Sequence, residues 1–217
     1  MSTCCNHCRA TDEHFDARNA GGDLRRYLRK GPSFTTRSLR DGLRSQSEGA
    51  SLLDIGAGAG ALTFELLGRG VEHVTVVDAS AAYLGVVRSE AERRGIADSV
   101  TTRHGDFVSV VDDVAEVDVV TLDRVVCCYP AFEPLLRSAT ARARRCLAVS
   151  YPRNRFAVRA MIECANLMRR IMRDDFRAFV HSPKEMEAVV HGAGFRLDSR
   201  RRSFFWSADV YARAGVA

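Results

Sequence analysis

The sequence contains no apolar run of the length that a membrane-spanning helix needs, and its start lacks the hydrophobic core of a secretory signal. Internal repeats and low-complexity segments are also absent. These absences predict a cytoplasmic protein without a membrane partner. Seven cysteines without an export signal are expected to be reduced thiols or ligands rather than a disulfide framework.

Lysine is scarce: the basic residues are nearly all arginine, and acidic residues are interleaved with them almost one for one. The formal net charge of +5 would favour an anionic substrate without demanding one. The densest clusters, at 142–145 and 200–202, are typical of solvated helix ends or strand edges. We therefore do not expect a nucleic-acid partner. No sequence feature indicates an oligomeric state.

Short apolar segments alternate with helical patterns along a chain whose hydrophobic content of 46% can form one sizeable core. Such alternation predicts an α/β domain with a parallel sheet and right-handed crossovers. The tail alternates as two further strands, near 195–203 and 204–213. The first five strands are expected at 51–55, 73–78, 99–104, 117–123 and 146–151.

The segment 52–60 reads Leu-Leu-Asp-Ile-Gly-Ala-Gly-Ala-Gly, a buried strand that ends in an acid and three alternating glycines. Glycines permit a tight turn, and the helix that follows points its first N–H groups at a bound ligand. Two alternatives fit the run by itself. It matches a dinucleotide-binding pattern through Gly56, Gly58 and Ala61, and it would also serve as a turn with no ligand.

Acids stand at the ends of three successive predicted strands, as Asp54, Asp78 and Asp106. Together with the glycines, this set resembles the class I S-adenosylmethionine-dependent methyltransferases. The resemblance implies a single Rossmann-like domain with a seven-stranded, mostly parallel sheet, a C-terminal antiparallel hairpin and helices on both faces. It also implies S-adenosylmethionine as the cofactor. A chain of 217 residues leaves little room for the separate substrate domain of a nicotinamide dehydrogenase.

The same resemblance implies a role for each matched residue. Asp54 would hold the cofactor's amino group indirectly, and Asp78 would accept hydrogen bonds from both ribose hydroxyls, which suits a carboxylate. Asp106 would lie near the adenine amine, beside the backbone amide and apolar ring of Phe107. The expected cofactor-binding residues are Asp54, Gly56, Gly58, Gly60, Asp78, Ala79, Asp106, Phe107 and Asp123.

Three regions are expected along the chain: a cysteine-rich tail over 1–14, a helical segment over 15–50 and the methyltransferase domain over 51–217. The helical segment breaks at Gly31-Pro32 and resembles the lid that covers the cofactor in many members of the class. An ordinary helical pair on the sheet edge is the alternative. The tail carries Cys4, Cys5, His7 and Cys8. Its single C-x-x-C pair cannot complete a four-ligand metal site without two further ligands. We expect an uninvolved terminus and assign no metal, with a thiolate metal site as the alternative.

The acceptor should lie beyond the carboxyl ends of the strands. Tyr129 and Tyr151 follow the fourth and fifth strands there, and His181 precedes a helix capped by Ser182. His181 is a candidate general base near neutral pH, and a histidine hydrogen-bonded within a loop is the alternative. No N-P-P-Y or D-P-P-Y sequence follows the fourth strand, which disfavours methylation of a nucleic-acid amine. The candidate catalytic residues are His181, Tyr129 and Tyr151.

A long amphipathic helix is expected over 154–173, and its apolar face would pack in the core or roof the pocket. Arg153 or Arg155 at its start would pair with an anionic acceptor. The apolar face comprises Val158, Met161, Ile162, Ala165, Met168 and Ile171 or Met172. The expected substrate residues are Tyr27, Tyr129, Arg153, Arg155 and Met161.

Segments 123–130 and 150–153 are similar to the magnesium-protoporphyrin O-methyltransferases, which implies a large, flat, partly apolar acceptor that bears carboxylates. Taken together, the sequence predicts a methyltransferase that acts on an oxygen or sulfur of a hydrophobic, neutral or anionic small molecule. An RNA or protein methyltransferase is an alternative. A protein that binds a cofactor or a metal without turnover is another.

Overall fold

A computed structural model describes residues 17–215, which form one seven-stranded mixed sheet in the order β3-β2-β1-β4-β5-β7-β6. The first five strands pair in parallel, and β7 pairs antiparallel with both β5 and β6. The predicted fold class is confirmed. The strands are β1 (Ser51–Ile55), β2 (His73–Asp78), β3 (Val100–His104), β4 (Val117–Asp123), β5 (Ala143–Pro152), β6 (Phe195–Arg202) and β7 (Trp206–Arg213).

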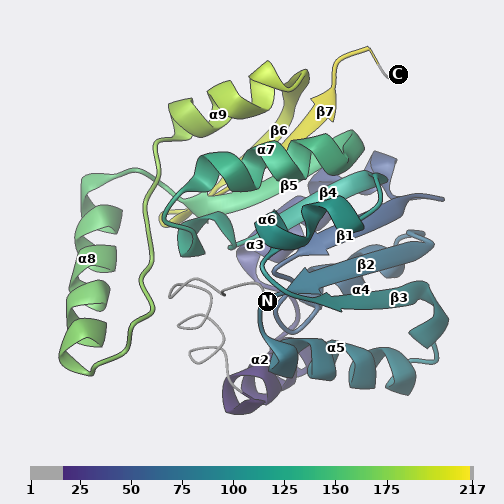
Figure 1. The fold of residues 1–217 in the computed structure, drawn as a ribbon, viewed down its shortest axis with the longest axis horizontal. Helices are drawn as coiled ribbons and strands as arrows, with labels where there is room; N and C mark the ends of the chain where they lie inside the picture. The colour runs from purple at the N-terminus through teal and green to yellow at the C-terminus, as the bar shows by residue number, and fades with distance from the viewer. Residues whose placement is uncertain (1–16, 216–217) are drawn as a thin grey trace.

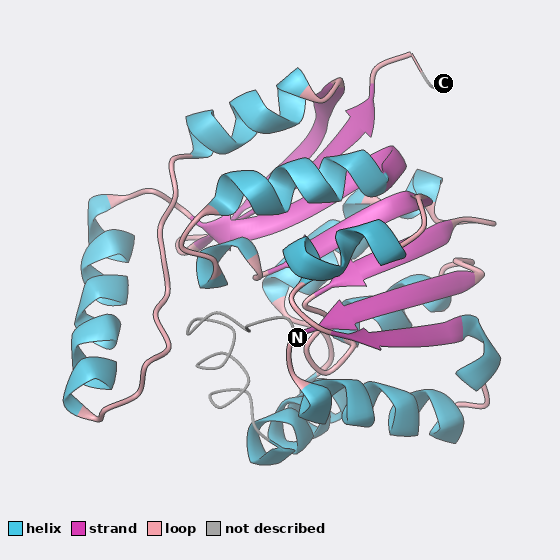
Figure 2. Cartoon of the chain, viewed as in Figure 1, coloured by secondary structure: helices cyan, strands magenta, loops and turns pink. Residues whose placement is uncertain are grey.

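Helices cover both faces of this sheet (Figure 2). Successive residues of a strand point to opposite faces, so Leu53 enters a core with Leu135 and Leu136 of α7, whereas Leu52 enters a second core with Leu39 of α3. The helices are α2 (Ala17–Lys30), α3 (Phe34–Gly42), α4 (Ala61–Leu67), α5 (Ala81–Arg93), α6 (Phe107–Val110), α7 (Phe132–Arg142), α8 (Phe156–Ile171) and α9 (Pro183–Gly192).

Local signals set several boundaries. Strands β1, β2 and β4 begin and end at the predicted residues. The Ser182 side chain accepts a hydrogen bond from the Glu185 amide and caps α9, as its sequence indicates. β5 is longer than predicted, because Ala143 pairs with Val117 at one end and β7 runs beside the strand to Pro152 at the other.

The long helix α8 departs from expectation. It stands at the edge of the molecule, apart from the sheet (Figure 1). Only Val158 and Ile162 are buried on it, so the alternative that its apolar face packs in the core is wrong. The helix instead packs against the extended segment 172–182, where the Asn166 side chain exchanges two hydrogen bonds with the backbone of Ala178. None of the helices between residues 17 and 215 has the length and hydrophobicity that crossing a bilayer demands.

Candidate cofactor and acceptor site

The glycine loop between β1 and α4 requires its glycines. Gly56, Gly58 and Gly60 have φ angles of 61°, 55° and 75°, in the left-handed region that side chains rarely adopt. A Cβ atom on Gly56 would lie 2.7 Å from Val125, and one on Gly60 would lie 2.8 Å from the Phe64 ring. The loop at the carboxyl end of β1 therefore packs closely on Val125 and Phe64, and only glycine fits at these positions.

The Asp78 carboxylate lies beside this loop. Its Oδ2 accepts a hydrogen bond of 3.1 Å from the Gly58 amide, and its Oδ1 accepts one of 2.8 Å from the Ser80 amide. The acid at the end of β2 is thereby held against the turn that follows β1. This arrangement fits a cofactor whose ribose crosses the glycine loop.

Asp54 is fully buried beneath the loop. Thr63 donates a hydrogen bond of 2.6 Å to its Oδ2, and Thr121 donates one of 2.7 Å to its Oδ1. Burial raises the pKa of Asp54 to about 7, and the two hydroxyl hydrogen bonds oppose that rise. Asp54 thereby joins the end of β1 to α4 and β4, the helix and strand on either side of it, which fits the indirect role that the resemblance implies.

Asp106 and Tyr129 meet across the site. The Tyr129 hydroxyl donates a hydrogen bond to Asp106 Oδ1, and the Ser109 hydroxyl lies 3.2 Å from Oδ2. Phe107 is buried in the core between the sheet and α7, so its ring is not at the site surface. The Ala79 carbonyl lies 2.9 Å from His104 Nε2. The contact of Tyr129 with Asp106 links the predicted acceptor side to the predicted adenine side.

Asp123 at the end of β4 anchors the N-terminal helices to the sheet. Its Oδ2 accepts a hydrogen bond of 2.7 Å from Thr36 of α3, and its Oδ1 accepts one of 2.6 Å from Ser150 of β5. Sequence reasoning missed both partners. Neither carries a local signal, since 87 and 27 residues separate them from Asp123.

His181 lies on the segment that returns from α8. Its Nε2 is 2.9 Å from the Tyr129 carbonyl and 3.1 Å from the Val126 carbonyl, so this nitrogen donates to the β4–α7 connection. The rings of Phe132 and Phe179 lie 4.9 Å and 6.0 Å from the imidazole. Burial lowers the pKa of His181 below its ordinary value, which favours the neutral imidazole.

Tyr151 is not brought together with these residues. It is buried, and its hydroxyl donates a hydrogen bond of 2.7 Å to Asp209 of β7. Arg200 makes a two-pronged contact with the same carboxylate at 2.8 and 2.9 Å. Tyr151 therefore belongs to a buried polar cluster between strands.

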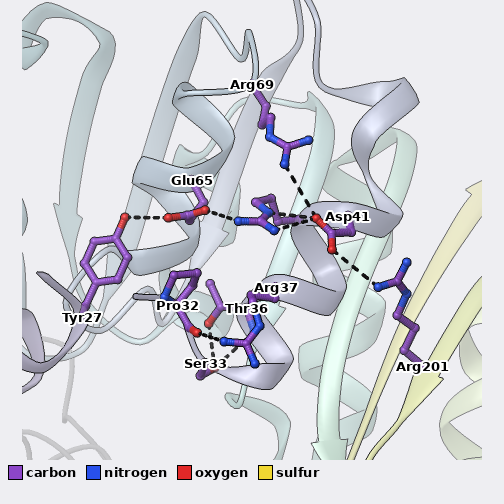
Figure 3. A network of polar contacts seen from close by, with 10 residues as sticks. Tyr27, Pro32, Ser33, Thr36, Arg37, Asp41, Glu65, Arg69 and Arg201 are labelled. Carbon is purple, nitrogen blue, oxygen red and sulfur yellow. Dashed lines mark hydrogen bonds and ion pairs between the residues drawn. The ribbon is translucent and has the colours of Figure 1, made fainter. Parts of the chain in front are cut away.

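Tyr27 is likewise held elsewhere, in the network shown in Figure 3. Its hydroxyl donates a hydrogen bond of 3.0 Å to Glu65 of α4, and Arg40 of α3 reaches the other oxygen of Glu65 at 2.6 Å. Asp41 of α3 forms ion pairs with Arg40, Arg69 and Arg201. Arg201 belongs to the edge strand β6. The network fastens α2 and α3 to α4.

Of the three substrate candidates around α8, the two arginines contact the turn between β6 and β7, and Met161 faces solvent. The Arg153 guanidinium donates a hydrogen bond of 2.8 Å to the Ser203 carbonyl. Arg155 lies over the ring of Phe204, 5.3 Å from its centroid, and 53% of Met161 is exposed.

Arg124 is a residue that sequence reasoning missed. It follows β4 with a φ of 64°, an uncommon conformation for a residue with a side chain. Its amide donates to Ser150, its guanidinium is half exposed, and the next residue, Val125, packs under Gly56. The Arg124 guanidinium lies 3.9 Å from the Asp123 carboxylate, at the end of β4.

The two cysteines after β4 behave as structural thiols. Cys127 and Cys128 lie with their sulfurs 3.3 Å and 3.5 Å from the Arg124 carbonyl. The hydrogen bond with Cys128 and burial raise the pKa of Cys127 well above its usual value, so its thiol stays protonated. Within residues 17–215, no group of His, Cys, Asp and Glu side chains could hold a metal ion. Cys4, Cys5, His7 and Cys8 lie outside the described residues.

This fold and this loop define a class I methyltransferase architecture. Residues 52–150, which include the glycine loop and the acids that follow β2, β3 and β4, match the family described as "Methyltransferase domain". This match covers a little under half of the chain. Among curated proteins, none matches the sequence significantly.

Solved structures share the fold at low identity. Magnesium protoporphyrin IX methyltransferase from Synechocystis PCC 6803, with bound S-adenosylmethionine, aligns over 99% of this chain and 100% of its own, with a TM-score of 0.67 and 16% identity. An O-methyltransferase family protein from Burkholderia thailandensis aligns over 92% of this chain and 61% of its own, with a TM-score of 0.72 and 14% identity. An O-methyltransferase family 2 protein from Planctomyces limnophilus in complex with apigenin aligns over 91% and 62%, with a TM-score of 0.66 and 18% identity.

Proposed function

We propose that this protein is a cytoplasmic enzyme that transfers the methyl group of S-adenosylmethionine to an oxygen or sulfur of a hydrophobic, neutral or anionic small molecule. The observation that carries the proposal is the contact of Asp78 with the glycine loop. A carboxylate and three left-handed glycines meet at one edge of the sheet. The cofactor supplies a methyl carbon activated by its sulfonium, so the protein has to bind and orient the acceptor and, where the accepting group is a hydroxyl or thiol, remove its proton.

The predicted cofactor-binding residues fall into two groups, those that would contact the cofactor and those that would hold the site together. Gly56, Gly58 and Gly60 would pass under the cofactor, while Asp78 would accept the ribose hydroxyls. Asp106 and Ala79 would face the adenine. The buried Asp54 and the bridging Asp123 would act by holding the loop and the helices over 15–50, which we propose as a lid.

The acceptor side would be formed by Tyr129, His181 and Arg124. Aromatic rings surround His181, and Arg124 adds a half-exposed positive charge at the end of β4. This combination favours a flat, apolar acceptor with an anionic or ionisable group. Two structural neighbours carry O-methyltransferase names and a third acts on magnesium protoporphyrin IX, which supports oxygen as the accepting atom.

His181 would accept the acceptor's proton through Nδ1, because Nε2 donates to backbone carbonyls. The lowered pKa keeps this nitrogen unprotonated near pH 7, which is the state that a general base needs. A carboxylate acceptor would need no base. An effect of His181 on turnover therefore also reports the kind of acceptor.

The proposal is tested by thermal denaturation followed by an acceptor panel. S-Adenosylmethionine and S-adenosylhomocysteine should raise the melting temperature, whereas NAD should not. Turnover is then measured with a porphyrin carboxylic acid, a phenol, a thiol and RNA. Stabilisation by NAD alone would contradict the cofactor, and preferential methylation of RNA would contradict the acceptor class.

The role of His181 is tested with two variants. For a phenol or thiol, His181→Ala should lower kcat by roughly 10²-fold while S-adenosylhomocysteine affinity is unchanged. His181→Gln keeps an N–H donor for the carbonyls but supplies no base at Nδ1. If His181→Gln restored kcat, the residue would position the loop only.

A further inference from the structure

Helix α8 carries an apolar face that the described part of the molecule leaves uncovered. Its six large side chains range from 53% exposed for Met161 to 90% for Phe156. At ~100° per residue they fall on about half of the helix circumference, with alanines and Cys164 between them. A continuous exposed patch of this kind marks a surface that meets a partner. The six are Phe156, Met161, Leu167, Met168, Ile171 and Met172.

The opposite side of α8, and not this face, packs against the rest of the protein. Val158 and Ile162 are buried on another side, where Asn166 binds the returning segment and Arg169 lies over the Phe176 ring. The side of α8 that the protein uses for packing is therefore already occupied. Arg159 and Arg170 are exposed along one border of the uncovered face, together with Glu163.

Charge is concentrated in the same region. Segment 153–177 holds seven arginines and three acidic residues, so it carries most of the chain's net charge of +5. Phe204, in the turn between β6 and β7, is 58% exposed and stacks with Arg155 at the start of the helix. A second copy of this face would bring like charges together. The surface is complementary to a negatively charged, apolar partner.

We propose that α8 and the Phe204 turn dock on the surface of an anionic lipid bilayer. The apolar side chains would enter the headgroup region, and the arginines would contact lipid phosphates while their stems remain among apolar groups. The expectation that the protein has no membrane partner rests on the lack of a spanning segment. Docking in the interfacial plane needs none.

The test is sedimentation of the full chain with vesicles of phosphatidylcholine alone or mixed with phosphatidylglycerol. We expect binding to the anionic vesicles at about 0.1 M salt and weaker binding at about 0.5 M. The double variant Phe156→Ser, Leu167→Ser should weaken binding by roughly tenfold or more. Leu28→Ser, at a residue of α2 that is 48% exposed, is the matched control and should bind as the wild type does.

A second pair of variants tests the charge. Arg159→Glu should weaken binding to anionic vesicles, whereas Arg26→Glu, on exposed α2, should have a smaller effect. Melting temperature and S-adenosylhomocysteine affinity serve as folding checks for every variant. No binding to anionic vesicles would overturn the proposal. So would equal binding by the Phe156 and Leu28 variants, or a dimer in light scattering that Leu167→Ser dissociates, which would assign the face to a second copy.

Discussion

Asp78 is the residue on which we propose that cofactor recognition depends most directly. It already contacts the Gly58 and Ser80 amides at 3.1 and 2.8 Å. We expect Asp78→Ala to weaken S-adenosylhomocysteine binding by about 1–3 kcal/mol, because it removes the carboxylate that we propose accepts hydrogen bonds from the ribose hydroxyls. Calorimetry measures the change. Asp112→Ala, at a side chain that is 99% exposed, is the control, and equal affinities for the two variants would contradict the assignment.

Gly56 and Gly85 make a matched pair for testing the loop. Gly56 has a φ of 61°, and an added Cβ would meet Val125 at 2.7 Å, whereas nothing lies within 4 Å of a Cβ on Gly85 inside α5. We expect Gly56→Ala to lower the melting temperature and to abolish cofactor binding. Gly85→Ala should raise stability by about 0.5–1 kcal/mol, because alanine favours a helix. Thermal denaturation with and without S-adenosylhomocysteine measures both, and a tolerated Gly56→Ala would show that the loop adapts.

The two tyrosines show why a position after a strand does not by itself define a pocket. Tyr129 leaves the sheet after β4 and reaches Asp106. Tyr151 remains in β5, because it pairs with Ser207 of β7, and its hydroxyl turns to Asp209. The extent of cross-strand pairing determines which aromatic faces the site.

At the scale of elements, α8 and its return segment form an arm that is joined to the domain at few points. Within the arm, the Asn166 side chain makes two hydrogen bonds with the backbone of Ala178. The arm meets the domain where the Phe179 amide donates a hydrogen bond of 2.7 Å to the Cys127 carbonyl. This architecture predicts that the arm opens without unfolding the sheet.

Asn166→Ala tests that prediction. Loss of its two hydrogen bonds should speed tryptic cleavage after Arg173 and Arg177 several-fold, while the melting temperature falls by only a few degrees. Asn154→Ala, at an exposed residue before α8, is the matched control. Unchanged cleavage would show that other contacts hold the arm. Mass spectrometry of the digest identifies the cut sites.

At the scale of the whole molecule, two buried carboxyl groups give opposite pH dependence. The pKa of Asp54 rises to about 7, so the native state binds its proton more tightly than the unfolded chain does. Its contribution to the free energy of unfolding is greatest below about pH 4 and declines as the pH rises toward 7. Hydrogen bonds from Arg93 and Arg94 lower the pKa of Glu90 to about 2. The contribution of Glu90 to the free energy of unfolding is therefore lost as the pH falls below 4.5.

We therefore expect Asp54→Asn to flatten the decline of unfolding free energy between pH 4 and 7, by at most about 1.4 kcal/mol per pH unit. Urea denaturation across this range measures the slope. Asp112→Asn should leave it unchanged. A slope in Asp54→Asn equal to that of the wild type would place the titrating group elsewhere.

The sequence by itself determined most of the elements and the conformation of the glycine loop. Alternating apolar segments define β1, β2 and β4 to the residue, and the glycines with their flanking acids define the turn after β1. These features are local, since strand patterning and positive φ angles depend on neighbouring residues. The same local chemistry predicted the capped start of α9.

Only the tertiary structure decided which side chains meet. Thr36 reaches Asp123 across 87 positions, and Thr121 reaches Asp54 across 67, through a strand order that no local pattern encodes. The exposure of α8 was also undecided, because an amphipathic pattern shows that a helix has an apolar face but not whether the fold covers it. Packing against the return segment takes up the side that carries Val158 and Ile162 and leaves the broader apolar face outside.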